Sequence, residues 1–371
     1  MRLPVSWTSL IILLSATAPL ANAAEPALTD DSKCGCYLMK GNDTSYFRNH
    51  RFFDFRDHAH HSGVPPAIRE MDKTASAPPT SPYFTSPEFR DFWYLSVWDN
   101  SNGARPDATV KMVNSPNNVY LEGNSDPNPS PKSWLTLRTQ RLQGFQTAAE
   151  IASNSSDFLY LSMRMMARTT GSPGALTAMF TYRHSDELAK VQESDLEVRT
   201  SDPKNIVHYT NQPSYTDDGE LVPNATKNAT MPNGLKWSDW AVHRLDWAPK
   251  STTWYVNDVQ VAQIEFQTPR EPSNILLNAW SDGGKWTGNM TLWDAAYLQL
   301  QWFEIVYNTT EPAQEREENN KGCQAVCSID STRQLGKPVM LWNNGAARIL
   351  QAGGGLGIWL PLAMGVLFLV A

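Results

Sequence analysis

The chain has 371 residues, a formal net charge of −7 and hydrophobic residues at 41% of positions, enough to bury a large core. The charge is mild and spread along the sequence, with no Lys/Arg block of the kind that neutralises phosphates. This pattern argues against nucleic acid as a partner.

The first residues have the features of a secretory signal peptide. Arg2 precedes an apolar run at 10–14, and the small residues at 21–23 supply a cleavage pattern. We therefore assign residues 1–23 to the signal peptide and expect the mature chain to begin near Ala24. Such a chain would fold in an oxidising compartment.

The four cysteines stand at the two ends of the mature chain, Cys34 and Cys36 near its start and Cys323 and Cys327 near its end. In an oxidising compartment they predict two disulfides that tie the ends together, with zinc ligation as the alternative. Spacing does not determine which cysteines pair. Closing so long a loop would stabilise the fold by about 4 to 5 kcal/mol for one bridge alone and less for the second. We expect residues 323–347 to form a stapled, extended tail.

Short alternating runs, separated by Pro, Gly, Asn and Asp, fill the middle of the chain and predict antiparallel strands. They lie at residues 134–138, 158–164, 193–197, 240–247, 253–256, 259–266, 275–280 and 298–307. Two packed antiparallel sheets, an all-β sandwich, account for them best, and residues 24–322 suit one such domain. The Pro- and Ser-rich stretches 62–87, 124–132 and 211–234 are expected to be loops, the last a wall beside the strand at 193–197.

Three acids alternate in that strand: Glu193, Asp195 and Glu197. In an extended backbone they share one face, while Ser194 and Leu196 take the other. Three acids crowded on one surface repel one another and contribute nothing to folding, so the arrangement indicates a reaction site. A solvated outer strand face and a calcium site are the alternatives.

Cleavage of a glycosidic bond needs one protonated carboxyl and one carboxylate, which Glu193 and Glu197 can supply. Their backbones would lie about 13 Å apart along an ideal strand. Side chains leaning together would bring the carboxyls to roughly 5 Å, the separation of a retaining mechanism. Asp195 between them would hold the two glutamates in different protonation states by raising the pKa of one.

These residues resemble glycoside hydrolase family sixteen, the laminarinase and lichenase group, in its fungal, lipid-anchored type. The Glu-x-Asp-x-Glu pattern is its signature. Similar segments are Met-Phe-Thr-Tyr at 179–182, the hairpin at 243–257 and Ile-Leu-Leu-Asn-Ala-Trp at 275–280. The resemblance covers about residues 134 to 307.

The resemblance implies a jelly-roll β-sandwich of the concanavalin A-like kind. It implies that Glu193 is the nucleophile, Glu197 the general acid/base and Asp195 their electrostatic assistant. It also implies a set of glucan contacts: Phe180, Tyr182, Asn211, Asn278 and Trp280. Two departures stand out: Ser194 replaces the usual Ile or Val, and Val191-Gln192 replaces a tryptophan common in lichenases. No cofactor and no metal ligands are predicted.

Further features fit a secretory route. Asn-x-Ser/Thr sequons occur at Asn42, Asn154, Asn224, Asn228, Asn289 and Asn308. At the C-terminus, small residues at 343–347 precede a polar spacer and an apolar end that is short for a membrane span. We predict a glycosylphosphatidylinositol (GPI) attachment signal at 348–371, with the lipid on Asn344. A plain tail anchor is the alternative.

Together these features predict a secreted, GPI-anchored, monomeric retaining endo-β-glucanase at the outer face of the plasma membrane or in the cell wall. Its substrate would be a β-1,3- or β-1,3-1,4-glucan of the fungal wall. Because a covalent intermediate can pass to a sugar hydroxyl, a transglycosylase that remodels glucan or glucan–chitin is one alternative. A non-catalytic carbohydrate-binding wall protein is the other, since fold alone does not establish activity.

Overall fold

The computed structural model describes residues 26–41, 44–101, 104–216, 218, 220–310, 323–330 and 332–343. The expected signal peptide, Asn42, Asn344 and the expected anchor signal lie outside the described residues. Within them, no helix combines the length and hydropathy needed to cross a membrane.

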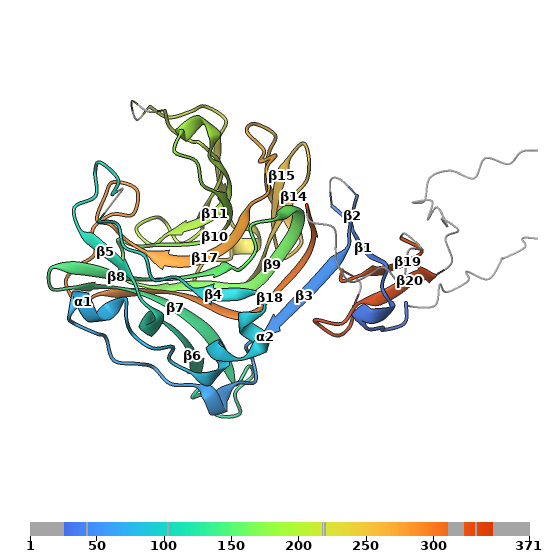
Figure 1. Cartoon of the computed structure of the whole chain (residues 1–371), viewed down its shortest axis with the longest axis horizontal. Helices are drawn as coiled ribbons and strands as arrows, with labels where there is room; N and C mark the ends of the chain where they lie inside the picture. Colours follow the sequence, from blue (N-terminus) through green and yellow to red (C-terminus); the bar gives the residue numbers. More distant parts are fainter. Residues whose placement is uncertain are drawn as a thin grey trace, which may run out of the picture.

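Two curved antiparallel layers form a β-sandwich, so the predicted all-β fold is confirmed (Figure 1). The first layer follows the order β13 (Thr226–Thr230), β12 (Ile206–Gln212), β11 (Gln192–Arg199), β10 (Leu176–Arg183), β17 (Asn274–Trp280), β8 (Phe145–Ser153) and β4 (Trp93–Leu95). The second contains β6 (Val119–Gly123), β7 (Ser133–Leu142), β18 (Ala295–Thr309), β9 (Phe158–Gly171), β14 (Ala241–Trp247), β15 (Thr252–Val256) and β16 (Val259–Ile264).

Two further strands join the layers at their margins. β3 (Asn49–Asp54) pairs with β18, and β5 (Lys111–Asn114) runs parallel to the start of β8. β8 also pairs with β7 near its start and with β17 further along, so it passes from one layer to the other. The helical elements are short: η1 (Asp31–Lys33), η2 (Ala59–His61), α1 (Met71–Thr74), η3 (Pro82–Thr85), α2 (Pro87–Arg90), η4 (Pro116–Asn118), η5 (Leu188–Lys190) and η6 (Pro232–Gly234).

Side-chain alternation determines which residues fill the space between the layers. Leu196 and Val198 of β11 point into the main hydrophobic core, where they join Met179, Leu277 and Trp254 from other strands. Apolar area removed from water in this core stabilises the sandwich by about 25 cal/mol per Å². The same alternation sends the acids of β11 to the opposite face.

Asn257 and Asp258 form the hairpin turn between β15 and β16. Both residues adopt left-handed backbone angles, with φ of 47° and 62°, as a tight type I′ turn requires. The expectation of a loop over all of 211–234 is wrong, because β13 lies within it. β13 has no buried apolar alternation, and backbone pairing with β12 at the sheet edge makes it a strand.

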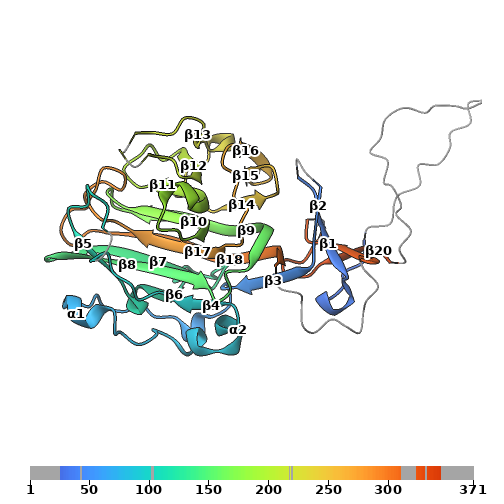
Figure 2. The same cartoon turned by 45° about the horizontal axis from the view of Figure 1, so that its top comes forward.

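The two ends of the described chain form a separate small sheet of β2 (Ser45–Phe47), β1 (Cys36–Met39), β19 (Ala325–Ser328) and β20 (Val339–Asn343). It lies beside the sandwich, where β3 enters it (Figures 1 and 2). The described residues of 323–343 contribute two strands to the small sheet, β19 and β20. The expected boundary at 323 separates strands that pair with each other, since β1 and β19 run side by side in parallel.

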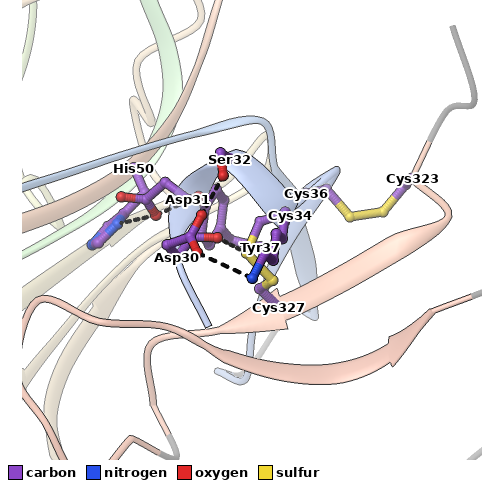
Figure 3. Close-up of a disulfide and its surroundings, with 10 residues drawn as sticks. Asp30, Asp31, Ser32, Cys34, Cys36, Tyr37, His50, Cys323 and Cys327 are labelled. Carbon is purple, nitrogen blue, oxygen red and sulfur yellow. Dashed lines mark hydrogen bonds and ion pairs between the residues drawn. A yellow bond between two sulfur atoms is a disulfide. The ribbon is translucent and has the colours of Figure 1, made fainter. Parts of the chain in front are cut away.

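Two disulfides join the strands of this small sheet, as the cysteine positions predicted. Cys34 bonds to Cys327 and Cys36 to Cys323, a pairing that spacing left open (Figure 3). Tyr37, Phe47 and Ile329 pack around Cys34 and Cys327 and against Val306 of β18. The Cys34–Cys327 bridge thus belongs to a small core that rests on the sandwich, whereas Cys323 of the other bridge is exposed.

A buried ionic network also fastens the small sheet to the sandwich. His50 on β3 lies 2.8 Å from Asp31 through Nδ1 and 3.0 Å from Glu304 through Nε2. Arg164 donates two hydrogen bonds to Glu304, at 2.9 and 2.6 Å, and a third to the carbonyl oxygen of Ile329. Burial lowers the pKa of His50, but the hydrogen bonds to Asp31 and Glu304 outweigh it and raise the pKa to about 9.

We expect this network to make the stability of the fold fall in alkaline solution. A histidine whose pKa rises from 6.5 to about 9 on folding contributes fully below pH 6.5 and loses that contribution as the pH passes through about 9. The contribution is up to about 3 kcal/mol. Urea denaturation from pH 6 to 9.5 should show the loss, and His50→Gln should flatten the profile. His184→Gln, at an exposed histidine, should leave the wild-type slope unchanged.

Candidate active site

The acidic strand lies in the middle of the first layer, between β10 and β12. Residues opposite one another on paired strands share a face, so the register identifies the neighbours of each acid. On β10, Tyr182 stands opposite Glu193, and Phe180 stands opposite Asp195. Three carboxylates and two aromatic rings therefore occupy one surface of the sheet.

This surface forms the floor of an open cleft with a volume of about 410 Å³. The three acids line it, together with four of the five predicted substrate contacts: Phe180, Tyr182, Asn278 and Trp280. Asn278 and Trp280 come from β17, whose register with β10 brings them to the same face. The cleft is large enough for sugar units and combines apolar rings with convergent polar groups.

The prediction that Asn211 contacts the substrate is wrong. Asn211 stands opposite Ser194 on β12, and both residues face the core with no exposed surface. Its side chain accepts a hydrogen bond from the Ser194 hydroxyl at 2.6 Å and donates one to the carbonyl oxygen of Phe266 at 3.0 Å. Odd and even positions of a strand face opposite ways, so Asn211 supports the sheet from beneath.

The hydrogen bond between Ser194 and Asn211 explains why this chain has Ser194 where the family usually has Ile or Val. In place of an apolar side chain, a polar pair forms between β11 and β12, and the Ser194 hydroxyl also lies 3.0 Å from Thr252 of β15. A buried polar group costs free energy unless it is hydrogen-bonded, and here both members are. The departure thus supplies a specific link beneath the acids.

Burial raises the pKa of all three acids. It raises the pKa of Glu193 to about 8, with a further rise from Glu197, whereas a hydrogen bond from Asp195 opposes the change. The pKa of Asp195 lies well above its ordinary range because of burial and the charges of both glutamates. The raised pKa lets Asp195 hold a proton that it can donate to the Glu193 carboxylate, and Gln212 donates a hydrogen bond to Oδ2 of Asp195 at 3.2 Å.

Glu197 has a different set of neighbours. Burial raises its pKa to about 7, and three groups limit the rise: the Trp286 indole and the charges of Arg105 and Arg199. Nε1 of Trp286 donates a hydrogen bond to Oε1 of Glu197 at 3.2 Å. The two glutamates thus have separate stabilising partners, Asp195 for one and an indole with two arginines for the other.

A fourth carboxyl group lines the cleft, and no sequence pattern predicted it. Glu150 on β8 is 5% exposed, and burial raises its pKa. It accepts hydrogen bonds from Nε1 of Trp98 at 2.8 Å and from the amide of Asn278, its cross-strand neighbour. The available signal in the sequence was a single charged residue among the uncharged residues of Phe145–Ser153.

The remaining predicted positions lie elsewhere. In the described part of the chain, no group of three His, Cys, Asp or Glu side chains is arranged to hold a metal ion, the acids of β11 included. Four of the sequon asparagines are exposed: Asn154, Asn224, Asn228 and Asn289. Asn308 is half-buried, and its side chain hydrogen-bonds to the backbone at Arg48 and Tyr46.

Two asparagine substitutions distinguish a residue that supports the sheet from beneath from a residue that lines the cleft. Asn211→Ala removes a buried amide that bridges β12 to the segment after β16, so we expect a loss of about 1 to 3 kcal/mol in the free energy of unfolding. Asn278→Ala is the comparison in the cleft, where the side chain loses only the hydrogen bond that its amide donates to Glu150, since Oδ1 has no hydrogen-bond partner among the described residues. Thermal denaturation should show the larger drop for Asn211→Ala. Equal drops would contradict the different placement of the two residues.

Comparison with known proteins agrees with this arrangement. The family model described as Glycosyl hydrolases family 16 matches residues 96–300, more than half of the chain. Among curated proteins, none matches the chain.

Several solved structures are similar at low sequence identity. A Bacillus licheniformis β-glucanase is 18% identical, with 58% of this chain and 92% of that chain covered and a TM-score of 0.46. A prokaryotic β-1,3-1,4-glucanase (lichenase) from a mouse hindgut metagenome is 15% identical, with 70% and 99% covered and a TM-score of 0.45. The laminarinase catalytic domain from Thermotoga maritima is 14% identical, with 60% and 93% covered and a TM-score of 0.44.

Proposed function

Because the chain belongs to glycosyl hydrolases family 16, we propose that it is a retaining endo-β-glucanase that cleaves β-1,3- or β-1,3-1,4-linked glucan. The observation that carries this proposal is the placement of Glu193 and Glu197 on one face of β11, in an open cleft with an aromatic floor. Phe180, Tyr182 and Trp280 offer flat rings on which the apolar faces of sugar units can stack.

The two glutamates would divide the chemistry. Glu197 protonates the glycosidic oxygen as the bond to the leaving sugar breaks, and the Glu193 carboxylate attacks the anomeric carbon to form a glycosyl ester. Glu197, now ionised, then removes a proton from water, which displaces Glu193 and gives a product with the original anomeric configuration. Asp195 stabilises the Glu193 carboxylate with its hydrogen bond before attack and after release.

The open cleft also suits transfer to a sugar. In the second step, the hydroxyl of another glucan chain can replace water, and the product is then a longer or branched chain. Hydrolysis and transglycosylation thus share the intermediate on Glu193, and the acceptor determines which one results. Analysis of products with and without added laminari-oligosaccharide would distinguish them, since only transfer gives chains longer than the substrate.

We further propose that the enzyme is secreted as a monomer and held by a GPI anchor on Asn344, close to cell-wall glucan. The apolar segments at both ends of the sequence and two disulfides support this location. Release of the protein from cells by a phosphatidylinositol-specific phospholipase C would be expected. Retention after that treatment would contradict the anchor.

Azide rescue tests the roles of the two glutamates. Glu193→Ala and Glu197→Ala should each lower turnover of laminarin or lichenan by at least about 10³-fold. With an activated β-glucoside, azide should restore Glu197→Ala by attacking the glycosyl ester, giving a β-glycosyl azide. In Glu193→Ala, azide should attack from the side of the missing carboxylate and give the α-anomer. Nuclear magnetic resonance of the products separates these outcomes.

Three results would contradict the assignments. Exchanged anomers would reverse the two roles, and inversion in the wild type would exclude the glycosyl ester. Binding without cleavage or transfer of either glucan by the wild type would favour the non-catalytic wall protein.

The raised pKa values predict a bell-shaped pH profile centred near neutrality. Burial raises the pKa of Glu193 to about 8 and that of Glu197 to about 7, so both hold protons in acid and both lose them in alkali. Between these values the pair is singly ionised, mostly with the charge on Glu197 because Glu193 has the higher pKa, and turnover uses the minor form with the charge on Glu193 and the proton on Glu197. Values of kcat/KM should therefore fall below about pH 7 and above about pH 8. A plateau that continues to pH 5 would contradict this electrostatic description.

A further inference from the structure

The Trp286 indole, which donates to Glu197, is held on two sides by charged or polar groups. The Arg199 guanidinium carbon lies 4.6 Å from the centre of its ring, and the His208 imidazole meets it edge-on at 5.3 Å. Arg199 follows Glu197 by two positions on β11 and shares its face, and His208 stands opposite Glu197 on β12. Two side chains of that face, Arg199 and His208, thus pack against the indole.

Both of these side chains bind the same oxygen of Asp202. Asp202 lies in the turn between β11 and β12, and its Oδ2 is 2.5 Å from Nε2 of His208 and 3.7 Å from Nη1 of Arg199. In the described structure, Nδ1 of His208 and Nε of Arg199 are buried without hydrogen-bond partners. The hydrogen bond that orients the His208 ring is therefore the one to Asp202.

The loop that carries Trp286 also rests on this turn. Gly288 has a φ of +79°, and a Cβ there would lie 3.0 Å from the Ser201 hydroxyl. The close approach places the loop and the turn in direct contact. A carboxylate in the turn can therefore set the position of a ring in the loop.

We propose that Asp202 is a positioning residue: by holding His208 and Arg199 against Trp286, it keeps the indole N–H on Glu197. The inference rests on the proposed function, in which Glu197 is the acid/base. Asp202 itself is absent from the cleft lining and touches no reacting atom. Its effect is on the ionised form of Glu197, which the N–H stabilises after the proton has passed to the leaving sugar.

The charges around Glu197 determine whether loss of Asp202 raises or lowers the pKa of Glu197. Asp195 and Glu193 share its strand face, Arg199 and His208 lie beside it, and Arg105 and Asp282 face the same end of the cleft from the loops after β4 and β17. Loss of Asp202 would have two opposite consequences. A displaced indole no longer stabilises the Glu197 carboxylate, which raises the pKa of Glu197. An unpartnered Arg199 would instead stabilise that carboxylate and lower its pKa.

A titration independent of substrate tests the proposal. In protein carrying ¹³C at glutamate carboxyls, the Glu197 signal is identified by its absence from Glu197→Gln, and its midpoint is followed in Asp202→Ala, Trp286→Phe and the double variant. Trp286→Phe removes a hydrogen bond to a charged group, so we expect a rise of about one pH unit. Asp202→Ala should raise the midpoint in the same direction, and the double variant should match Trp286→Phe. The acid limb of kcat/KM, near pH 7, should move likewise.

Other outcomes would overturn the proposal. A lowered midpoint in Asp202→Ala would mean that Asp202 acts by screening Arg199. An unchanged midpoint with a lower Tm would leave only a structural role, and additive shifts in the double variant would mean independent action. His208→Gln removes the same link and takes the place of Asp202→Ala should that variant fail to fold.

A half-buried carboxylate in the other layer provides the matched control. Asp246 accepts two hydrogen bonds from Arg244, at 2.7 and 2.6 Å, so Asp246→Ala should lower Tm without moving the Glu197 midpoint. Because the titration needs no glucan, a wild type inactive on every glucan would count against the proposed function alone. The shift of the midpoint would still decide the role of Asp202.

Discussion

The alternation of side chains along β11 is the constraint on which the site depends. Leu196 and Val198 are committed to the core, so Glu193, Asp195 and Glu197 must face the cleft together. A shift of the register by one residue would move the acids into the hydrophobic core and turn the core side chains toward the cleft. The same hydrophobic packing that stabilises the sandwich therefore holds three mutually repelling carboxyls in place.

Placing these three carboxyls together is electrostatically unfavourable, and the resulting pKa shifts suit their chemistry. Burial and mutual repulsion raise their pKa values, and each glutamate then has its own means of bearing charge. For Glu193 it is a protonated aspartate, and for Glu197 it is an indole with nearby arginines. An acid and a nucleophile need such unequal surroundings, because identical residues in identical environments would not take different roles.

A second polar system lies far from the cleft, where the chain ends meet. His50, Arg164 and Glu304 form a buried network at the joint between the small sheet and the sandwich, next to two disulfides. Buried ion pairs are weak sources of stability, but removing one partner leaves an uncompensated charge. The joint thus resists separation, and the two ends of the described chain stay together on one side of the sandwich.

The sequence alone determined the class of fold and the acidic strand, because a repeat of two residues assigns each side chain to a face, whereas the aromatic and amide residues of the cleft floor were predicted from the resemblance to glycoside hydrolase family sixteen. It did not reveal Glu150 or the true position of Asn211, since both depend on which strands become neighbours and how they are aligned. β13 and the pairing of the cysteines were hidden for the same reason. The Asp202, His208 and Trp286 cluster joins a turn, a strand and a distant loop, and contacts of that kind exist only once the chain has folded.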